Sequence, residues 1–140
     1  MKLDVARVDV YSANLQDKPG ALAKKLTVLS DAGADLEFLL AHRHENRRGK
    51  GVAYVAPLKG AAQSKAARKA RFTKANRLSV LRVEGADKPG VGTTITTALG
   101  DAGINVREIT TVTTGKKFVV HVALDSAADA TQAARILRRL

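Results

Sequence analysis

The strongest constraint on this chain is an internal repeat. The phrase Asp17-Lys18-Pro19-Gly20 returns as Asp87-Lys88-Pro89-Gly90, and Asp31-Ala32-Gly33 returns as Asp101-Ala102-Gly103. In each copy an apolar stretch of helical length separates the two phrases. Because both phrases return at the same offset, which is half of the 140 residues, the sequence indicates one structural unit written twice.

We therefore predict two domains, at residues 1–74 and 75–140. A unit of about 65–70 residues buries only about 60% of the surface that its unfolded chain exposes. Such a unit is marginally stable alone, so we expect the repeats to pack against each other or against a second chain.

The first copy has the hydrophobic periodicity of a strand, a helix, two strands and a helix. Pro19 suits the first helical position because it lacks an N–H, and Gly33 suits a left-handed helix end. The alanine stripe of the last helix, at positions 62, 66 and 70, is thin. The expected elements are a strand at 6–11, a polar turn at 14–18, a helix at 20–32, strands at 36–42 and 52–56, and a helix at 60–70.

The second copy repeats this order and predicts the same fold. Ser126 and Asp129 form a capping pair that opens the last helix. The expected elements are a strand at 78–83, a helix at 91–102, a hairpin of strands 106–112 and 118–124, and a helix from 127. Helices on one face of an antiparallel sheet predict the α+β class, with two tandem ferredoxin-like modules. A fourth strand is evident neither in the joining segment 71–77 nor before the chain ends at Leu140.

Composition excludes several classes of site. The chain has no cysteine, which excludes disulfides, thiolate chemistry and zinc–thiolate sites. It has no run of 18 apolar residues, and Asp4, Arg7 and Asp9 interrupt any signal-peptide core. We therefore expect a cytoplasmic protein.

The net charge of +11 is concentrated in the middle of the chain. Residues 46–83 hold 11 of the 24 Lys and Arg residues and no acidic residue, while the rest of the chain is neutral. This basic segment, chiefly residues 47–77, suits a solvated helix face or a patch that binds nucleic acid. We favour the solvated face, because no nucleic-acid-binding motif is present and only Tyr54 and Phe72 lie nearby for base stacking. A basic nucleic-acid-associated regulator is the alternative function.

The repeated phrases carry a resemblance to a known family. A strand, an Asp-Lys-Pro-Gly turn, a helix ending in Ala-Gly and a strand opening Ile-Asn-Val together resemble the ACT domain. Residues 87–91 and 102–106 match this pattern more closely than residues 17–22 and 32–36. The first copy departs from it by carrying Asp35 where the second has Asn105.

The resemblance implies small regulatory modules that bind amino acids. It covers nearly the whole chain, which looks like a group of stand-alone proteins of two ACT domains without a catalytic partner. In that family the ligand commonly lies at an interface, between the turn of one module and the start of the second strand of a neighbour. The missing fourth strands depart from the family's full βαββαβ order.

The turn residues suit the chemistry of an amino acid. The unpaired N–H groups at a helix N-terminus attract a carboxylate, and glycine lets a ligand approach the backbone. The side chains of Asp17, Asp87, Asp35 and Asn105 can accept hydrogen bonds from an ammonium group. The candidate ligand-binding residues are Asp17, Lys18, Gly20, Ala21, Leu22, Asp35 and Leu36 in the first copy, and Asp87, Lys88, Pro89, Gly90, Val91, Gly92, Asn105 and Val106 in the second.

The second copy offers the fuller set, because Gly92 opens the backbone and Thr93 and Thr94 add hydroxyl groups. The alternative is that the phrase only starts a helix: Asp caps the first turn, Pro sets φ, and Gly packs closely against the sheet. In that case the chain is a structural module with degenerate sites.

No residue pattern indicates an enzyme, a cofactor or a metal site. His42 and His44 have only Glu45 as a third candidate ligand, and no nucleophile lies beside a base. His121 is predicted on the sheet face opposite Phe118. That face also carries Val119 and Ala123, so we expect a homodimer, with a separate protein partner for any downstream output.

Overall fold

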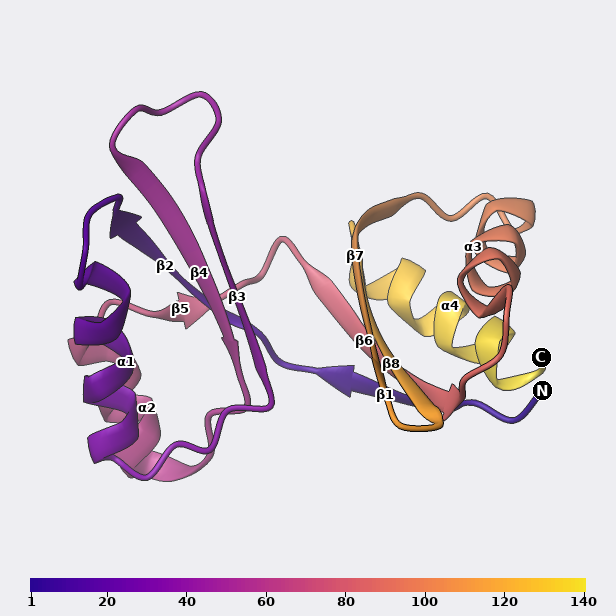
Figure 1. Cartoon of the computed structure of the whole chain (residues 1–140), viewed down its shortest axis with the longest axis horizontal. Coiled ribbons are helices and arrows are strands. Elements are labelled where there is room, and N and C mark those ends of the chain that lie inside the picture. Colours follow the sequence, from indigo (N-terminus) through magenta and orange to yellow (C-terminus); the bar gives the residue numbers. More distant parts are fainter. The chain divides into compact units, whose positions relative to one another are not determined.

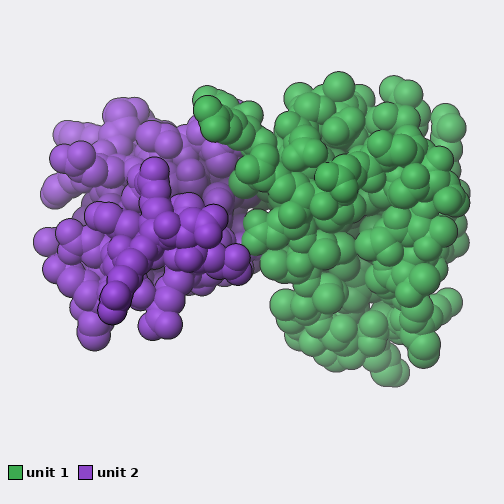
Figure 2. Space-filling view, turned by 90° about the horizontal axis from the view of Figure 1, so that it is seen from above, with its two compact units in different colours: residues 1–8, 76–140 green, residues 9–75 purple.

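The computed structural model describes all 140 residues and divides them into two compact units (Figures 1 and 2). Residues 9–75 form the inner unit, and residues 1–8 together with 76–140 form the outer unit. Each unit has a four-stranded sheet and two helices. Every strand pair is antiparallel, which confirms the α+β, ferredoxin-like fold class.

The inner unit has strand order β3-β4-β2-β5. Both helices lie on one face of this sheet (Figure 1). Its core joins Leu29 of the first helix, Val55 of the sheet and Phe72. The elements are β2 (Tyr11–Gln16), α1 (Ala21–Asp31), β3 (Phe38–Arg43), β4 (Lys50–Ala56), α2 (Gly60–Lys69) and β5 (Thr73–Lys74).

The outer unit has strand order β1-β6-β8-β7, again with both helices on one face (Figure 1). Its core includes Leu81, Ile95, Phe118 and Leu137, all at most 2% exposed. The elements are β1 (Asp4–Val8), β6 (Ser79–Ala86), α3 (Val91–Asp101), β7 (Val106–Thr114), β8 (Lys117–Leu124) and α4 (Ala127–Arg138).

The structure supplies both fourth strands that the sequence does not reveal. In the inner unit the strand is β5, which lies in the joining segment but has only two residues and pairs with Tyr11 and Ser12. In the outer unit it is β1, which comes from the opposite end of the chain and pairs with β6. A strand as short as β5 cannot show a period, and a strand from the far end of the chain leaves no local signal.

The first predicted strand, 6–11, is in fact two strands in different units. β1 ends at Val8 and pairs with β6, whereas β2 begins at Tyr11 and pairs with β4. The predicted polar turn 14–18 is also shorter, because Asn14, Leu15 and Gln16 complete the ladder with β4. Pairing across the sheet outweighs the turn propensity of these polar residues. The two compact units therefore differ from the predicted domains 1–74 and 75–140, because residues 1–8 belong with residues 76–140.

The predicted helix faces are confirmed with one exception. The stripe of α4 is buried, and the capping pair forms, with the Asp129 N–H donating to Ser126 Oγ at 3.0 Å. In α2 the buried alanines are Ala66, Ala67 and Ala70, whereas Ala62 is exposed. None of the four helices combines the length and apolar character needed to cross a membrane.

The N-terminal residues are firmly attached to the outer unit. Leu3 is 7% exposed and belongs to its core. Arg138 Nη2 donates to the Val5 carbonyl at 2.8 Å, and Arg7 Nη1 donates to Thr131 Oγ1 at 3.2 Å. The α-amino group of Met1 donates to the Leu140 carbonyl at 2.6 Å, which brings the two termini together (Figure 1).

Candidate functional site

The two Asp-Lys-Pro-Gly phrases form the same backbone turn. Gly20 has φ 84° and ψ −12°, and Gly90 has φ 86° and ψ 5°. In each turn the N–H of the residue after the glycine donates to the Lys carbonyl at 3.3 Å. Proline followed by a left-handed glycine is the pattern of a type II turn. The prolines therefore stand before the helices and not at their first positions, which corrects the sequence prediction.

The repeated aspartates anchor the turns to the neighbouring hairpins through their backbone. The Asp17 N–H donates to the Gly49 carbonyl at 3.0 Å, and the Asp87 N–H donates to the Lys116 carbonyl at 2.8 Å. Neither carboxylate caps its helix, because α1 and α3 have no side-chain cap. The Asp17 carboxylate instead forms an ion pair with Arg43, whose Nε lies 2.7 Å from Asp17 Oδ2. The carboxylates are thus available for a role other than capping.

The helix N-termini behind these turns are open. A Cβ at Gly20, Gly90 or Gly92 would meet no heavy atom within 4 Å. The two turn glycines are therefore required by their positive φ and not by close packing against the sheet, which corrects the alternative interpretation. Neither helix has an acidic residue in its first turn. The partial positive charge of each N-terminus is left for another anion.

A cavity of about 230 Å³ adjoins the first turn. Asp17 and Lys18 of the turn, Leu22 of α1 and the end of β3 from Ala41 to Arg43 contribute to its wall. The cavity thus places a carboxylate, a guanidinium and the first turn of a helix around one space. These groups are complementary to the ammonium and carboxylate of an amino acid.

Sequence reasoning missed Arg43 and His42 as members of this cavity. Helix α1 and the following loop separate them from Asp17 in the sequence, and only the pairing of β3 with β4 and of β4 with β2 brings them to the turn. The clue available in the sequence was the position of Arg43 at the end of a predicted strand.

The structure does not bring the two predicted halves of each site together within one unit. Residues 17–22 lie at the start of α1, whereas residues 35–36 follow its end. The 11 residues of that helix span about 16 Å at 1.5 Å per residue. The same separation holds for residues 87–92 and 105–106 on either side of α3. Each half can join its counterpart only on another module.

At the second turn, one of the two threonine hydroxyl groups is engaged within the helix. Thr94 Oγ1 donates to the Gly90 carbonyl at 3.0 Å, so this hydroxyl hydrogen is engaged within the helix. Lys88, Pro89, Gly92 and Asn105 are exposed, whereas Val91 is 6% exposed and belongs to the core. Val91 thus helps to hold α3 against the sheet.

The histidines do not form a metal site. The structure contains no group of three or more His, Asp or Glu side chains able to hold a metal ion. His42 lies beside Tyr54, with 6.2 Å between ring centroids. Burial, followed by the nearby charge of Arg82, lowers the pKa of His121, while Glu84 opposes the shift.

One of the two aromatic residues near the basic segment is not available to stack on nucleic-acid bases. Phe72 is 2% exposed and packs in the core of the inner unit, so its ring cannot stack on a base. Arg68 and Lys69 lie on the exposed side of α2, as predicted. The exposed basic residues therefore still support the nucleic-acid alternative, but only one of the two nearby aromatic residues remains available for base stacking.

Comparison with known proteins places this geometry in context. A family model for the ACT domain matches residues 79–140. A crystal structure of a protein from Bacteroides thetaiotaomicron has a TM-score of 0.76 at 15% identity, covering 97% of this chain and 99% of that chain. The ligand-free regulatory subunit of aspartate kinase from Thermus thermophilus has a TM-score of 0.67 at 15% identity, covering 99% and 96%.

The aspartokinase III of E. coli, in complex with aspartate and ADP, has a TM-score of 0.58 at 15% identity. This match covers 98% of the present chain and 32% of that enzyme. At these identities the three structures show a shared fold. The chain matches no curated protein sequence.

Proposed function

We propose that this chain is a non-catalytic regulatory module that binds an amino acid at its Asp-Lys-Pro-Gly turns. The match of the ACT domain family model to residues 79–140 supports this proposal. The observation that carries the proposal is the open helix N-terminus behind each turn, together with the aspartate carboxylate of the turn, which does not cap the helix. The resemblance of the fold to regulatory subunits of aspartate kinase supports a regulatory role.

At the first turn the bound amino acid lies in the cavity between α1 and β3. Its ammonium group binds the Asp17 carboxylate, and its carboxylate binds the Arg43 guanidinium or the N–H groups that open α1. Asp17 and Arg43 bind each other in the free protein at 2.7 Å. The zwitterion therefore replaces one exposed ion pair with two, at little cost, because such a pair contributes only about 0–1 kcal/mol.

At the second turn the ligand binds the backbone around Gly90 and Gly92, with Asp87 as the acceptor for its ammonium group. Asn105 completes this site from another module, because it lies beyond the far end of α3 in its own unit. A second copy of the chain is the source that we propose. Binding then favours the homodimer, and a separate protein partner reads the change in assembly.

We propose that the dimer uses the edge strands more than the sheet face that carries Val119 and Ala123. Ala123 is only 7% exposed within the single chain, so it offers little surface to a partner. The edge strands expose larger apolar side chains: Leu39 on β3 is 46% exposed, and Ile109 and Val112 on β7 are 40% and 61% exposed. An exposed edge with such side chains suits pairing with a second copy.

A panel of free amino acids tests the function. At millimolar concentration we expect at least one of them to raise the melting temperature of the full chain, because a ligand that binds only the folded state stabilises it. Mass measured by light scattering, with and without that amino acid, reports the coupling to assembly. Unchanged melting curves across the panel would contradict the function, and an unchanged mass despite binding would contradict only the coupling.

Matched variants locate the site. We expect Asp17→Asn to remove the shift if the first turn binds, and Asp87→Asn to remove it if the second turn binds, because the neutral amide loses the charged hydrogen bond. Asp31→Asn is the control, since Asp31 is exposed at the end of α1 and lies in neither turn. An undiminished shift in Asp17→Asn and in Asp87→Asn would exclude both turns.

A further inference from the structure

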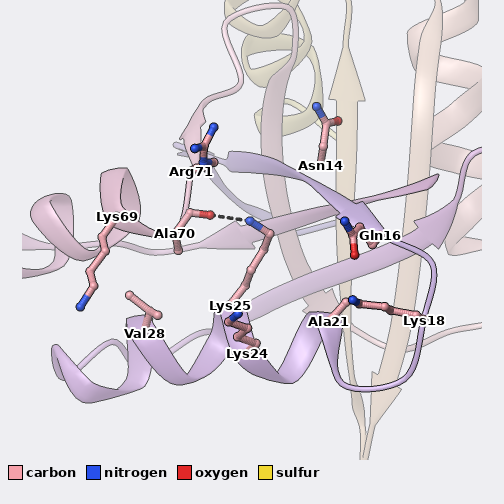
Figure 3. A pocket seen from close by; sticks show the side chains of 10 residues that line it. All are labelled: Asn14, Gln16, Lys18, Ala21, Lys24, Lys25, Val28, Lys69, Ala70 and Arg71. Carbon is pink, nitrogen blue, oxygen red and sulfur yellow. Dashed lines mark hydrogen bonds between the residues drawn. The ribbon is translucent and has the colours of Figure 1, made fainter. Parts of the chain in front are cut away.

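A second and larger cavity, of about 440 Å³, lies in the inner unit between α1, the edge of β2 and the end of α2 (Figure 3). It opens there because β5 covers only Tyr11 and Ser12, which leaves the rest of β2 without a neighbour on that side. Asn14 and Gln16 of this uncovered edge line it together with Ala21 and Val28 of α1. Its volume lies within the range of small-molecule sites.

Every charged side chain that lines this cavity is positive. They come from separate elements: the turn, α1, and the end of α2. The cationic residues are Lys18, Lys24, Lys25, Lys69 and Arg71. No aspartate or glutamate lines the cavity, although the sequence outside residues 46–83 is neutral overall. Three of these five residues lie outside that basic segment, namely Lys18, Lys24 and Lys25. The cluster is therefore assembled by the fold and does not follow from the basic segment alone.

Lys25 lies in the middle of this cluster (Figure 3). Its ammonium group donates to the Ala70 carbonyl at 2.7 Å and lies 6.0 Å from the centre of the Phe72 ring. Burial, and then the charges of Arg71 and Lys24, lower the pKa of this lysine. The ammonium has two further N–H donors, and a bound anion would offset the repulsion among its neighbours.

Arg71 adds an independent observation from the backbone. Helices α1, α2 and α3 end in the same motif, in which the second residue after the helix has positive φ. Glycine occupies that position after α1 and α3, as Gly33 with φ 83° and Gly103 with φ 74°. After α2 the position is Arg71, the one non-glycine residue of positive φ in the chain, with φ 64°.

A left-handed conformation disfavours any residue with a Cβ, so glycine would suit this position better. The hydrogen bonds of the motif are complete, with Arg71 N–H donating to the Arg68 carbonyl at 3.0 Å and Phe72 N–H donating to the Ala67 carbonyl at 2.8 Å. The helix end therefore needs no arginine side chain. A strained residue that the fold does not require is a reason to look for function.

We propose that this cavity binds a phosphorylated small molecule, with Arg71 and the four lysines holding its phosphate groups and Asn14 and Gln16 facing the remainder. Phosphate suits the site better than a carboxylate because one group carries up to two charges, and several cations converge on it. Arginine binds such a group through two parallel N–H donors, and lysine binds it as a point charge. This cavity adjoins the amino-acid cavity and shares Gln16 and Lys18 with it, but the phosphate proposal does not require that an amino acid binds there.

The test measures melting temperature and binding heat for the full chain with pyrophosphate and with ATP, at constant ionic strength. We expect both probes to raise the melting temperature of the wild type. In Arg71→Gly we expect affinity to fall about tenfold or more, because a charged hydrogen-bonding partner is lost. The same variant, without a probe, should melt at a higher temperature than the wild type, because glycine relieves the backbone.

Arg68→Ala is the charge-matched control, since Arg68 is exposed on α2 and does not line the cavity. This variant should bind both probes with the affinity of the wild type. Lys24→Gln, in contrast, should lower the affinity for both probes. Equal loss in Arg68→Ala and Arg71→Gly would overturn the proposal and indicate a diffuse basic surface. Binding of a single-stranded oligonucleotide, but of neither probe, would overturn it in favour of nucleic acid.

Discussion

Leu3→Ala is expected to destabilise the outer unit by about 2–5 kcal/mol, the range for deleting a buried leucine side chain. Leu3 stands near the end of the chain, where most residues are exposed and replaceable. Here it is 7% exposed and packs in a core whose other buried members begin only at Leu81. Urea unfolding, followed by far-ultraviolet circular dichroism, measures the loss as a lower midpoint.

The control is Lys2→Ala, which shortens the neighbouring side chain, an exposed one in the same unit. We expect it to change stability by no more than about 0.5 kcal/mol. Leu3→Met keeps most of the buried volume and should cost less than about 1.5 kcal/mol. Equal midpoints for Leu3→Ala and Lys2→Ala would show that residues 1–8 do not belong to the outer core.

Gly85→Ala is expected to cost about 1–3 kcal/mol, because it forces a methyl group into a filled space. A Cβ at Gly85 would lie 2.9 Å from Phe118 Cε1 and 3.0 Å from Leu3 Cδ2. The Phe118 ring is 2% exposed, so the surrounding core opposes its displacement. The effect is contrary to the usual gain from replacing glycine inside a strand.

Gly100→Ala is the matched control. Gly100 lies within α3, and a Cβ there would meet no heavy atom within 4 Å. Alanine should stabilise that helix by about 0.5–1 kcal/mol. The double variant Gly85→Ala with Leu3→Ala should lose less than the sum of its parts, because the smaller side chain vacates space for the new methyl group. Strict additivity would contradict the contact between these two residues.

The sequence predicted the features that depend on neighbouring residues. The helices, the glycines that end α1 and α3, and the capping pair of α4 all follow from residues within one or two turns of each other. The repeated turn was located correctly, but its start was misjudged by the position of the proline. Pro19 fits a helix start and a type II turn equally well, and the positive φ of Gly20 decides for the turn.

The candidate site was predicted only in part, for the same reason. The turn residues of both copies were predicted as ligand-binding because the phrase is repeated, and their role stays a prediction. Arg43 was not found, because its contact with Asp17 depends on two successive strand pairings. The basic cavity was seen only as charge along residues 47–77, although its lysines at 18, 24 and 25 come from outside that range.

Residue patterns alone therefore predicted a strand–helix–strand–strand–helix unit that occurs twice, with a Pro-Gly turn before each first helix. Strand pairing in the folded chain was needed to show that the N-terminal strand completes the unit at the other end of the chain, with residues 9–75 inserted between. The fold also decided which charged side chains meet around a cavity. Local hydrogen bonds and periodicity are encoded within a few residues, whereas strand partners and converging charges are chosen by packing between distant segments.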